Sequence, residues 1–231
     1  MIDNAFRALV PRFAGPLLGL YARWGWTPDH VTFLGFVLAL FAGAAVATGH
    51  PWAAAILWWV SRLADGTDGV YARASGQESD FGAYLDILLD MAAYGAMVLA
   101  FAIAWPDFQI QWALMLFFYV LCIASALALG NLESQRALPP RDDRGLRLGA
   151  GLAEGGETGI AYTVFLLVPG LLPVTTWLWV GVLATTVVAR TLLARRLLAP
   201  QEAGSSAGGH EGLAAQDVGN PIHDRNESPE V

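Results

Sequence analysis

The chain has 231 residues, of which 55% are hydrophobic and only 14% charged, and its mean hydropathy is +0.48. This composition is too apolar for an ordinary soluble domain and indicates a protein with several membrane-spanning segments. Most of the formal net charge of −7 comes from the residues after 200, where there are six acids and a single arginine, so the net charge says little about the apolar part. No nucleic-acid partner is expected.

Residues 4–24 mix three arginines with Phe, Leu and Trp at roughly helical spacing, which is typical of an amphipathic helix lying in the membrane interface. A flexible leader is the alternative. Six apolar stretches follow, each long enough to cross a bilayer as a helix of about 20 residues. They are expected near 30–48, 51–73, 81–105, 108–132, 158–175 and 177–198.

The chain is therefore expected to be all-α, a polytopic membrane protein with six transmembrane helices behind an N-terminal interfacial amphipathic helix. The expected divisions are a juxtamembrane helix in 1–25, a membrane domain in 26–200 and a disordered acidic tail in 201–231. We expect membrane lipids to surround this domain.

Arginines indicate how the spans are oriented. They occur before the first span, after the second and fourth, and at the end of the sixth, whereas the connections at 49–50, 106–107 and 174–176 carry none. Because positively charged loops stay in the cytoplasm, both termini are expected there.

Four aspartates lie on the inner edges of the second and third spans: Asp65, Asp68, Asp86 and Asp90. Charged groups at such depths are costly and rare. At about 1.5 Å per residue, Asp68 and Asp86 lie roughly 7.5 Å inside the cytoplasmic ends, and Asp65 and Asp90 roughly 12–13.5 Å inside. An antiparallel pair of spans would bring the four carboxylates together.

Four neighbouring carboxylates need countercharge to stay ionised. Arg62 and Arg73 supply part of it, and a hard divalent cation, which prefers carboxylate oxygens and is often shared with phosphates, would supply the rest. Gly66, Gly69 and Gly82 would let a ligand approach the backbone closely. Spacing alone leaves three alternatives: metal-dependent phosphate chemistry, the ion pathway of a cation- or proton-coupled transporter, and structural acid–arginine pairs.

Residues 65–90 match the pattern D-x2-D-G-x2-A-R-x8-G-x3-D-x3-D throughout, and "TPDHVTFLGF" (27–36) precedes it. With these motifs the chain resembles the CDP-alcohol phosphatidyltransferase family. The resemblance implies transfer of a phosphatidyl group from a CDP-linked lipid, such as CDP-diacylglycerol, to a polar alcohol, with release of CMP. It also implies a homodimer in a bacterial inner or plasma membrane, with a cytoplasmic active site.

The same resemblance implies roles for individual residues. Two Mg²⁺ or Mn²⁺ ions would be held by the motif aspartates Asp65, Asp68, Asp86 and Asp90. The last of them, Asp90, would also be the catalytic base. The CDP-linked donor would be contacted by Asp29, Thr32, Gly69, Arg73, Ser79 and Gly82.

The acceptor alcohol is less defined by the sequence. The stretch "GLAEGGET" (151–158) resembles one in members that use inositol phosphate, but Gly155 and Thr158 stand where those members have arginine. Arg136, Arg144 and Arg190 could still bind an anionic acceptor, or the loop arginines could serve only topology and lipid headgroups. Glycerol 3-phosphate, an inositol compound and another small alcohol remain open.

Overall fold

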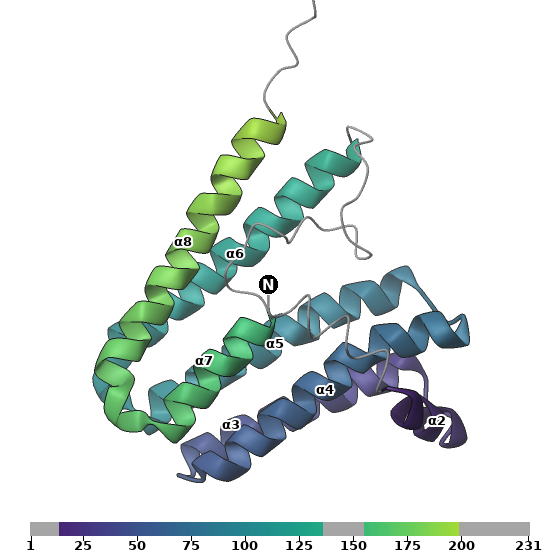
Figure 1. Ribbon diagram of the computed structural model, residues 1–231, viewed down its shortest axis with the longest axis horizontal. Helices are drawn as coiled ribbons and strands as arrows, with labels where there is room; N and C mark the ends of the chain where they lie inside the picture. The colour runs from purple at the N-terminus through teal and green to yellow at the C-terminus, as the bar shows by residue number, and fades with distance from the viewer. Residues whose placement is uncertain (1–13, 136–154, 199–231) are drawn as a thin grey trace, which may run out of the picture. The chain divides into compact units, whose positions relative to one another are not determined.

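The computed structural model describes residues 14–135 and 155–198, and every regular element in that part of the chain is a helix (Figure 1). The elements in chain order are α2 (Gly15–Arg23), α3 (Pro28–Ala47), α4 (Pro51–Ser75), α5 (Asp80–Ala104), the short 3₁₀ helix η1 (Pro106–Phe108), α6 (Gln109–Gln135), α7 (Gly155–Leu167), η2 (Pro169–Leu171) and α8 (Leu172–Leu198). The all-α expectation is confirmed for this part. The expected tail and the first half of the expected interfacial helix lie outside the described residues.

Four helical segments of the described chain are long and apolar enough to cross a membrane: Pro28–Ala47, Asp80–Ala104, Pro106–Leu132 and Pro169–Leu198. The chain is therefore a multi-pass membrane protein. The 25-residue helix α4 is long enough as well, but its second half carries Arg62, Asp65, Asp68 and Arg73. The described part of α7 has 13 residues.

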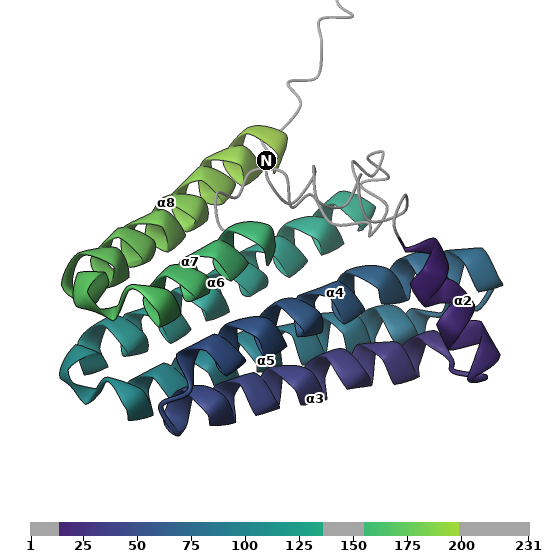
Figure 2. The ribbon, with the colours of Figure 1, turned by 60° about the horizontal axis from the view of Figure 1, so that its bottom comes forward.

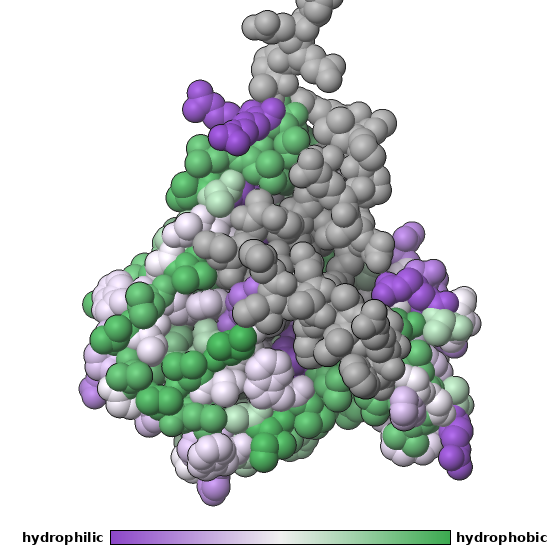
Figure 3. All heavy atoms as spheres, viewed as in Figure 1, coloured by the Kyte–Doolittle hydropathy of each residue, from purple (hydrophilic) through white to green (hydrophobic). Residues whose placement is uncertain are grey.

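The outer face of these helices is apolar. Large hydrophobic side chains lie on the surface: Trp52 is 70% exposed, and Ile103 and Ile110 are each 68% exposed. In Figure 3, hydrophobic residues cover much of the described surface in view, and the strongly hydrophilic ones gather mostly at its margins. Such a surface is suited to contact with lipid tails.

The turn before the last helix lies earlier than predicted. We expected the break at 174–176, but the preceding helix ends at Leu167 and the turn is formed by Pro169–Leu171. Pro173 is the second residue of α8, where a missing N–H removes no helical hydrogen bond. Pro169 therefore lies in the turn that ends α7, and Pro173 lies in the first turn of α8.

Helix α3 is the packing partner that α4 and α5 share. It lies closely along both, whereas α4 and α5 approach each other far less closely in the described chain. At Gly35 the backbones of α3 and α4 nearly touch, because an added Cβ would lie 3.3 Å from the Ser61 carbonyl oxygen and 3.4 Å from the Asp65 nitrogen. Ser61 Oγ donates to the Gly35 carbonyl at 2.7 Å and joins the same two helices.

A second group of helices completes the bundle. Figures 1 and 2 show α8 beside α6, while α7 packs on both α4 and α8. The contact with α4 includes a hydrogen bond of 2.9 Å from Trp59 Nε1 to Thr163 Oγ1. Buried aromatic rings, among them Trp58, Phe101 and Tyr162, fill the space between the groups.

Gly35→Ala should destabilise the protein by about 1–3 kcal/mol, since the α4 backbone cannot yield to the new methyl group. The measurement is thermal unfolding of the purified protein in detergent. Gly95→Ala on α5 is the matched control, because nothing lies within 4 Å of an added Cβ there. Equal unfolding temperatures for the two variants would contradict the close approach of α3 and α4.

Candidate active site

Asp68 is the most buried of the four predicted carboxylates, with 4% of its surface exposed. Its Oδ2 accepts a hydrogen bond of 2.6 Å from Thr32 Oγ1 of α3, and its Oδ1 accepts one of 2.6 Å from the Gly69 backbone N–H. A buried carboxylate needs such donors, so α3 fixes the direction of this side chain. The close approach at Gly35, one turn after Thr32, brings the two together.

Asp65 and Asp90 meet at a common partner, Arg62. The Arg62 guanidinium lies 3.6 Å from Asp65 Oδ2 and forms a hydrogen-bonded ion pair with Asp90 Oδ1. Asp65 and Arg62 come from α4, and Asp90 comes from α5. The prediction that Asp65 and Asp90 lie at the same depth agrees with this shared partner.

The fourth carboxylate, Asp86, lies near Asp68, which experiences the negative charges of both Asp65 and Asp86. Even so, no three acidic, histidine or cysteine side chains in the described part of the chain are close enough together to hold a metal ion. Carboxylate oxygens alone are the ligands that hard divalent cations prefer. The donor chemistry therefore fits Mg²⁺ or Mn²⁺, while the present spacing is wider than a coordination sphere.

The residues predicted to contact a nucleotide lie at the same end of α3, α4 and α5. Ser79 is the N-cap of α5 and its Oγ accepts a hydrogen bond of 2.9 Å from the Gly82 N–H. A Cβ on Gly82 would lie 3.0 Å from Ser79 Oγ and 3.2 Å from Asp29 Oδ1, so a larger residue would displace these side chains. Asp29 stands in the first turn of α3. The structure thus brings Asp29, Ser79 and Gly82 into contact.

Gly69 and Arg73 are also neighbours. A Cβ at Gly69 would lie 3.7 Å from Arg73 Nη1, so the arginine folds back over the glycine on the surface of α4. Arg73 is exposed, unlike Arg62, which is 7% exposed. The exposed guanidinium at this position is accessible to an anionic ligand such as a pyrophosphate.

The predicted acceptor residues are only partly within the structure. Arg136 and Arg144 lie outside the described residues. Arg190 is buried between α6 and α8, where its Nη1 donates to the Cys122 carbonyl at 2.5 Å and lies 3.3 Å from Ser125 Oγ. The structure therefore places Arg190 in a contact between α6 and α8, and its predicted role in acceptor binding remains a prediction.

Thr158, in the stretch that differs from inositol-phosphate-using members, is 3% exposed and hydrogen-bonded to Tyr119. The Tyr119 hydroxyl also accepts a hydrogen bond of 3.0 Å from Trp179 Nε1 and one of 3.0 Å from the Tyr162 hydroxyl. Thr158 is thus part of a neutral, buried polar network that joins α6, α7 and α8. It carries no charge toward an acceptor.

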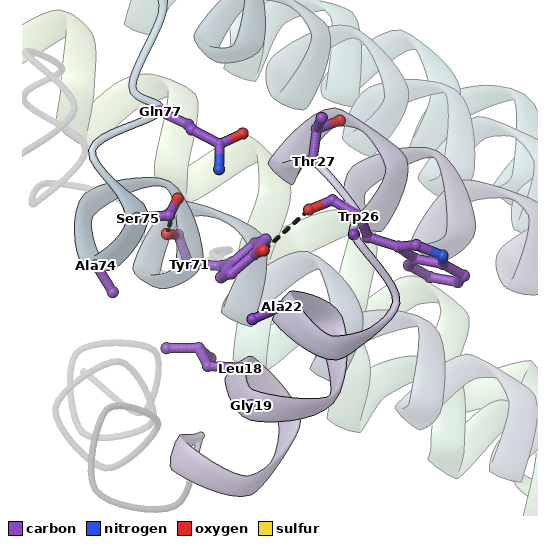
Figure 4. Close-up of a pocket in the computed structure, with 10 residues that line it drawn as sticks. Leu18, Gly19, Ala22, Trp26, Thr27, Tyr71, Ala74, Ser75 and Gln77 are labelled. Atoms are coloured by element: carbon purple, nitrogen blue, oxygen red, sulfur yellow. Dashed lines mark hydrogen bonds between the residues drawn. The ribbon is translucent and has the colours of Figure 1, made fainter.

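Sequence reasoning did not identify a pocket of about 600 Å³ between α2 and the last turns of α4 (Figure 4). Its walls include Gly19, Ala22 and Ser75, and Tyr71 closes one side by donating a hydrogen bond of 2.9 Å to the Trp26 carbonyl. None of the predicted site residues lines it. The sequence feature that could have indicated this pocket is the presence of small residues on the facing helices, such as Gly19, Ala22 and Ser75.

The comparison with known proteins agrees with this geometry. Residues 26–188 match the sequence model of the family described as CDP-alcohol phosphatidyltransferase. The chain is 29% identical to the inner membrane protein YnjF of Escherichia coli over 73% of its own length and 83% of that protein. It is 30% identical to a phosphatidylinositol phosphate synthase of Mycobacterium marinum, over 74% of this chain and 75% of the relative.

Two crystal structures of the Mycobacterium tuberculosis phosphatidylinositol phosphate synthase are similar to this fold. The structure with CDP-DAG bound is 25% identical, with a TM-score of 0.59, and the match covers 80% of this chain and 94% of that one. The complex with manganese and citrate is 26% identical, with a TM-score of 0.58, over 78% and 87% of the two chains.

The family match covers more than half of the chain and includes all four aspartates. It decides between the alternatives that spacing left open, since it supports a phosphotransfer enzyme rather than an ion-coupled transporter. The chain belongs to the CDP-alcohol phosphatidyltransferase family.

Proposed function

We propose that this enzyme transfers a phosphatidyl group from a CDP-diacylglycerol-type donor to a polar alcohol and releases CMP, at the carboxylate cluster between α4 and α5. The observation that carries the proposal is the joint placement of Asp65, Asp68 and Asp90 by two successive helices, with the polar side chains of Asp29 and Ser79 at the same end. The M. tuberculosis relative binds CDP-DAG, which supports the choice of donor.

Two divalent cations would be held by the four motif aspartates, Asp65, Asp68, Asp86 and Asp90. When bound, such ions neutralise pyrophosphate charge and stabilise the departing CMP. The Thr32 hydroxyl and the Gly69 N–H hold Asp68 in one orientation, so this ligand is prearranged. The manganese complex of the M. tuberculosis relative supports a divalent ion.

Asp90 is the proposed general base. Its carboxylate, ion-paired through one oxygen to Arg62, takes the proton of the acceptor hydroxyl. That hydroxyl oxygen then attacks the lipid-proximal phosphorus, the bond to the bridging oxygen breaks, and CMP leaves with the electron pair. Arg73 and the polar groups at Asp29 and Ser79 would hold the nucleotide half of the donor.

The site's depth in the membrane matches this chemistry. We propose six spans, with α4 and α7 added to the four apolar segments, and with the arginine-rich ends in the cytoplasm. The acyl chains of the donor would then remain in the bilayer while the nucleotide and the acceptor reach the carboxylates from the cytoplasm. Family resemblance also leads us to propose a homodimer.

The acceptor remains the least determined part of the proposal. Two observations point in different directions: relatives named phosphatidylinositol phosphate synthase favour an inositol phosphate, whereas the buried, uncharged Thr158 removes one cation that such members use. We propose a polar alcohol whose anionic group, where it has one, is bound by Arg136 or Arg144. Glycerol 3-phosphate, an inositol compound and another small alcohol are the alternatives.

CMP release from CDP-diacylglycerol should disappear with EDTA and return with Mg²⁺ or Mn²⁺, because four carboxylates and a pyrophosphate repel one another without cations. The measurement is CMP formation by purified enzyme in detergent with a mixture of small alcohols. Activity that is indifferent to chelation would refute the metal-dependent mechanism.

Asp90→Asn should lower kcat by about 10²–10⁴-fold and reduce donor affinity less than Asp68→Asn does, because the amide oxygen can still bind a metal ion but cannot take a proton. Asp68→Asn should instead weaken donor binding, since Asp68 is a proposed metal ligand. Both constants come from initial rates and from binding of labelled donor. Asp80→Asn, an exposed acid in the first turn of α5, is the control and should behave as wild type. Near-normal turnover in Asp90→Asn would exclude it as the base.

A panel of alcohols incubated with labelled CDP-diacylglycerol should yield one main lipid product, identified by mass. With that acceptor, Arg136→Ala or Arg144→Ala should raise the acceptor KM several-fold and leave donor affinity unchanged, because each would remove a cation that binds the acceptor. Arg195→Ala, in the last turn of α8, is the matched control. An unchanged acceptor KM in both loop variants would assign these arginines to topology alone.

A further inference from the structure

The guanidinium of Arg62 is surrounded by side chains of α4 and α5. Its guanidinium carbon lies 4.6 Å from the centre of the Trp58 ring and 5.1 Å from that of Tyr94, so the cation contacts both aromatic rings. Its Nη2 donates to Ser61 Oγ at 3.1 Å, and its Nη1 contacts the Tyr94 hydroxyl at 3.4 Å. The side chain is 7% exposed, and all these partners belong to α4 or α5.

The side chains around Arg62 restrict the movement of its guanidinium. Trp58 is fully buried and Tyr94 is 6% exposed, so neither ring can swing aside without opening the core. Ser61 is in turn fixed by its hydrogen bond of 2.7 Å to the Gly35 carbonyl of α3. Cation–π contacts of a desolvated arginine add to the ion pairs. Arg62 is therefore held in place by its surroundings as well as by the aspartates.

Arg62 lies where its positive charge can neutralise two carboxylates at once. It is the cation that joins Asp65 of α4 to Asp90 of α5, and a guanidinium remains protonated at every accessible pH. The other arginine expected to supply countercharge, Arg73, is exposed and lies over Gly69 instead. Without Arg62, the repulsion among the carboxylates would have to be relieved by a bound cation or by protonation.

We propose that Arg62 is the positioning residue of this site, a permanent counter-ion that holds Asp65 and Asp90 together across α4 and α5 and leaves the cluster in place for divalent cations. The inference rests on the proposed metal-dependent function. It implies that Arg62 and the divalent ions share one task, the neutralisation of the cluster. An enzyme that lacks the arginine should then depend on the metal for its stability as well as for its activity.

The test compares Arg62→Met with Arg62→Lys, two flexible side chains of similar length that differ in charge. Thermal unfolding of each purified protein in detergent is measured in EDTA and in saturating Mn²⁺. Arg62→Met should unfold on the order of 10 °C below wild type in EDTA, because the partly buried Asp65 and Asp90 lose the cation that they share. In Mn²⁺ the loss should shrink to less than half, since ion binding stabilises the folded state. Arg62→Lys should recover at least half of the loss in EDTA.

A purely structural arginine gives a different pattern. Equal losses for Arg62→Met in EDTA and in Mn²⁺, or equal losses for Met and Lys, would overturn the proposal. Should Arg62→Met fold in neither buffer, Arg62→Gln is measured in the same way. Tyr94→Phe is the control, because it removes a hydroxyl next to Arg62 but no charge. Its Mn²⁺-induced rise in unfolding temperature should equal that of wild type.

Wild-type enzyme separates failure of this inference from failure of the proposed function. If Mn²⁺ neither stabilises wild type nor restores its CMP release after chelation, the metal-dependent function itself is wrong. If Mn²⁺ does both in wild type but the Arg62→Met loss is the same in the two buffers, only the role of Arg62 is wrong.

Discussion

Charge neutralisation inside an apolar helix bundle is the constraint on which this structure depends. Helices α4 and α5 carry carboxylates toward each other, and an unpaired charge between them would disfavour the folded state. Arg62 satisfies part of that requirement by contacting Asp65 on its own helix and Asp90 on the next. Because α4 and α5 pack on α3 more closely than on each other, long polar side chains can meet between them. The same contacts therefore hold the fold together and position the proposed catalytic groups.

Helix α3 provides the second half of this arrangement without carrying a predicted metal ligand. Its glycine at position 35 allows the α4 backbone to approach, and its Thr32 hydroxyl then reaches Asp68 at 2.6 Å. Its first turn supplies Asp29, which lies against Gly82 of α5. One helix therefore sets the positions of the carboxylates and of the groups proposed to bind nucleotide. That explains why the motif of α4 and α5 is accompanied by a polar entry to α3.

Much of this arrangement could be predicted from periodicity and spacing, because apolar helices of fixed rise leave few ways to place four aspartates. The depth pairing of Asp65 with Asp90 followed from that rise alone, and the ion pairs of Arg62 agree with it. Packing details could not be predicted. Whether Pro169 or Pro173 ends a helix depends on tertiary contacts, and nothing in the sequence showed that Arg190 is buried between α6 and α8. The pocket beside Tyr71 depends on how α2 folds back.

The lengths of the helices also relate the enzyme to its bilayer. Helices α4 and α5 have 25 residues each, and α6 and α8 have 27 each. At a rise of about 1.5 Å per residue they extend to roughly 38–40 Å, beyond a hydrocarbon core of about 30 Å. A helix of this length that crosses the bilayer tilts or projects into the headgroup layer, and the degree of tilt depends on the local thickness. The proposed site lies between α4 and α5, so its geometry would change with the thickness of the membrane whose lipids the enzyme makes.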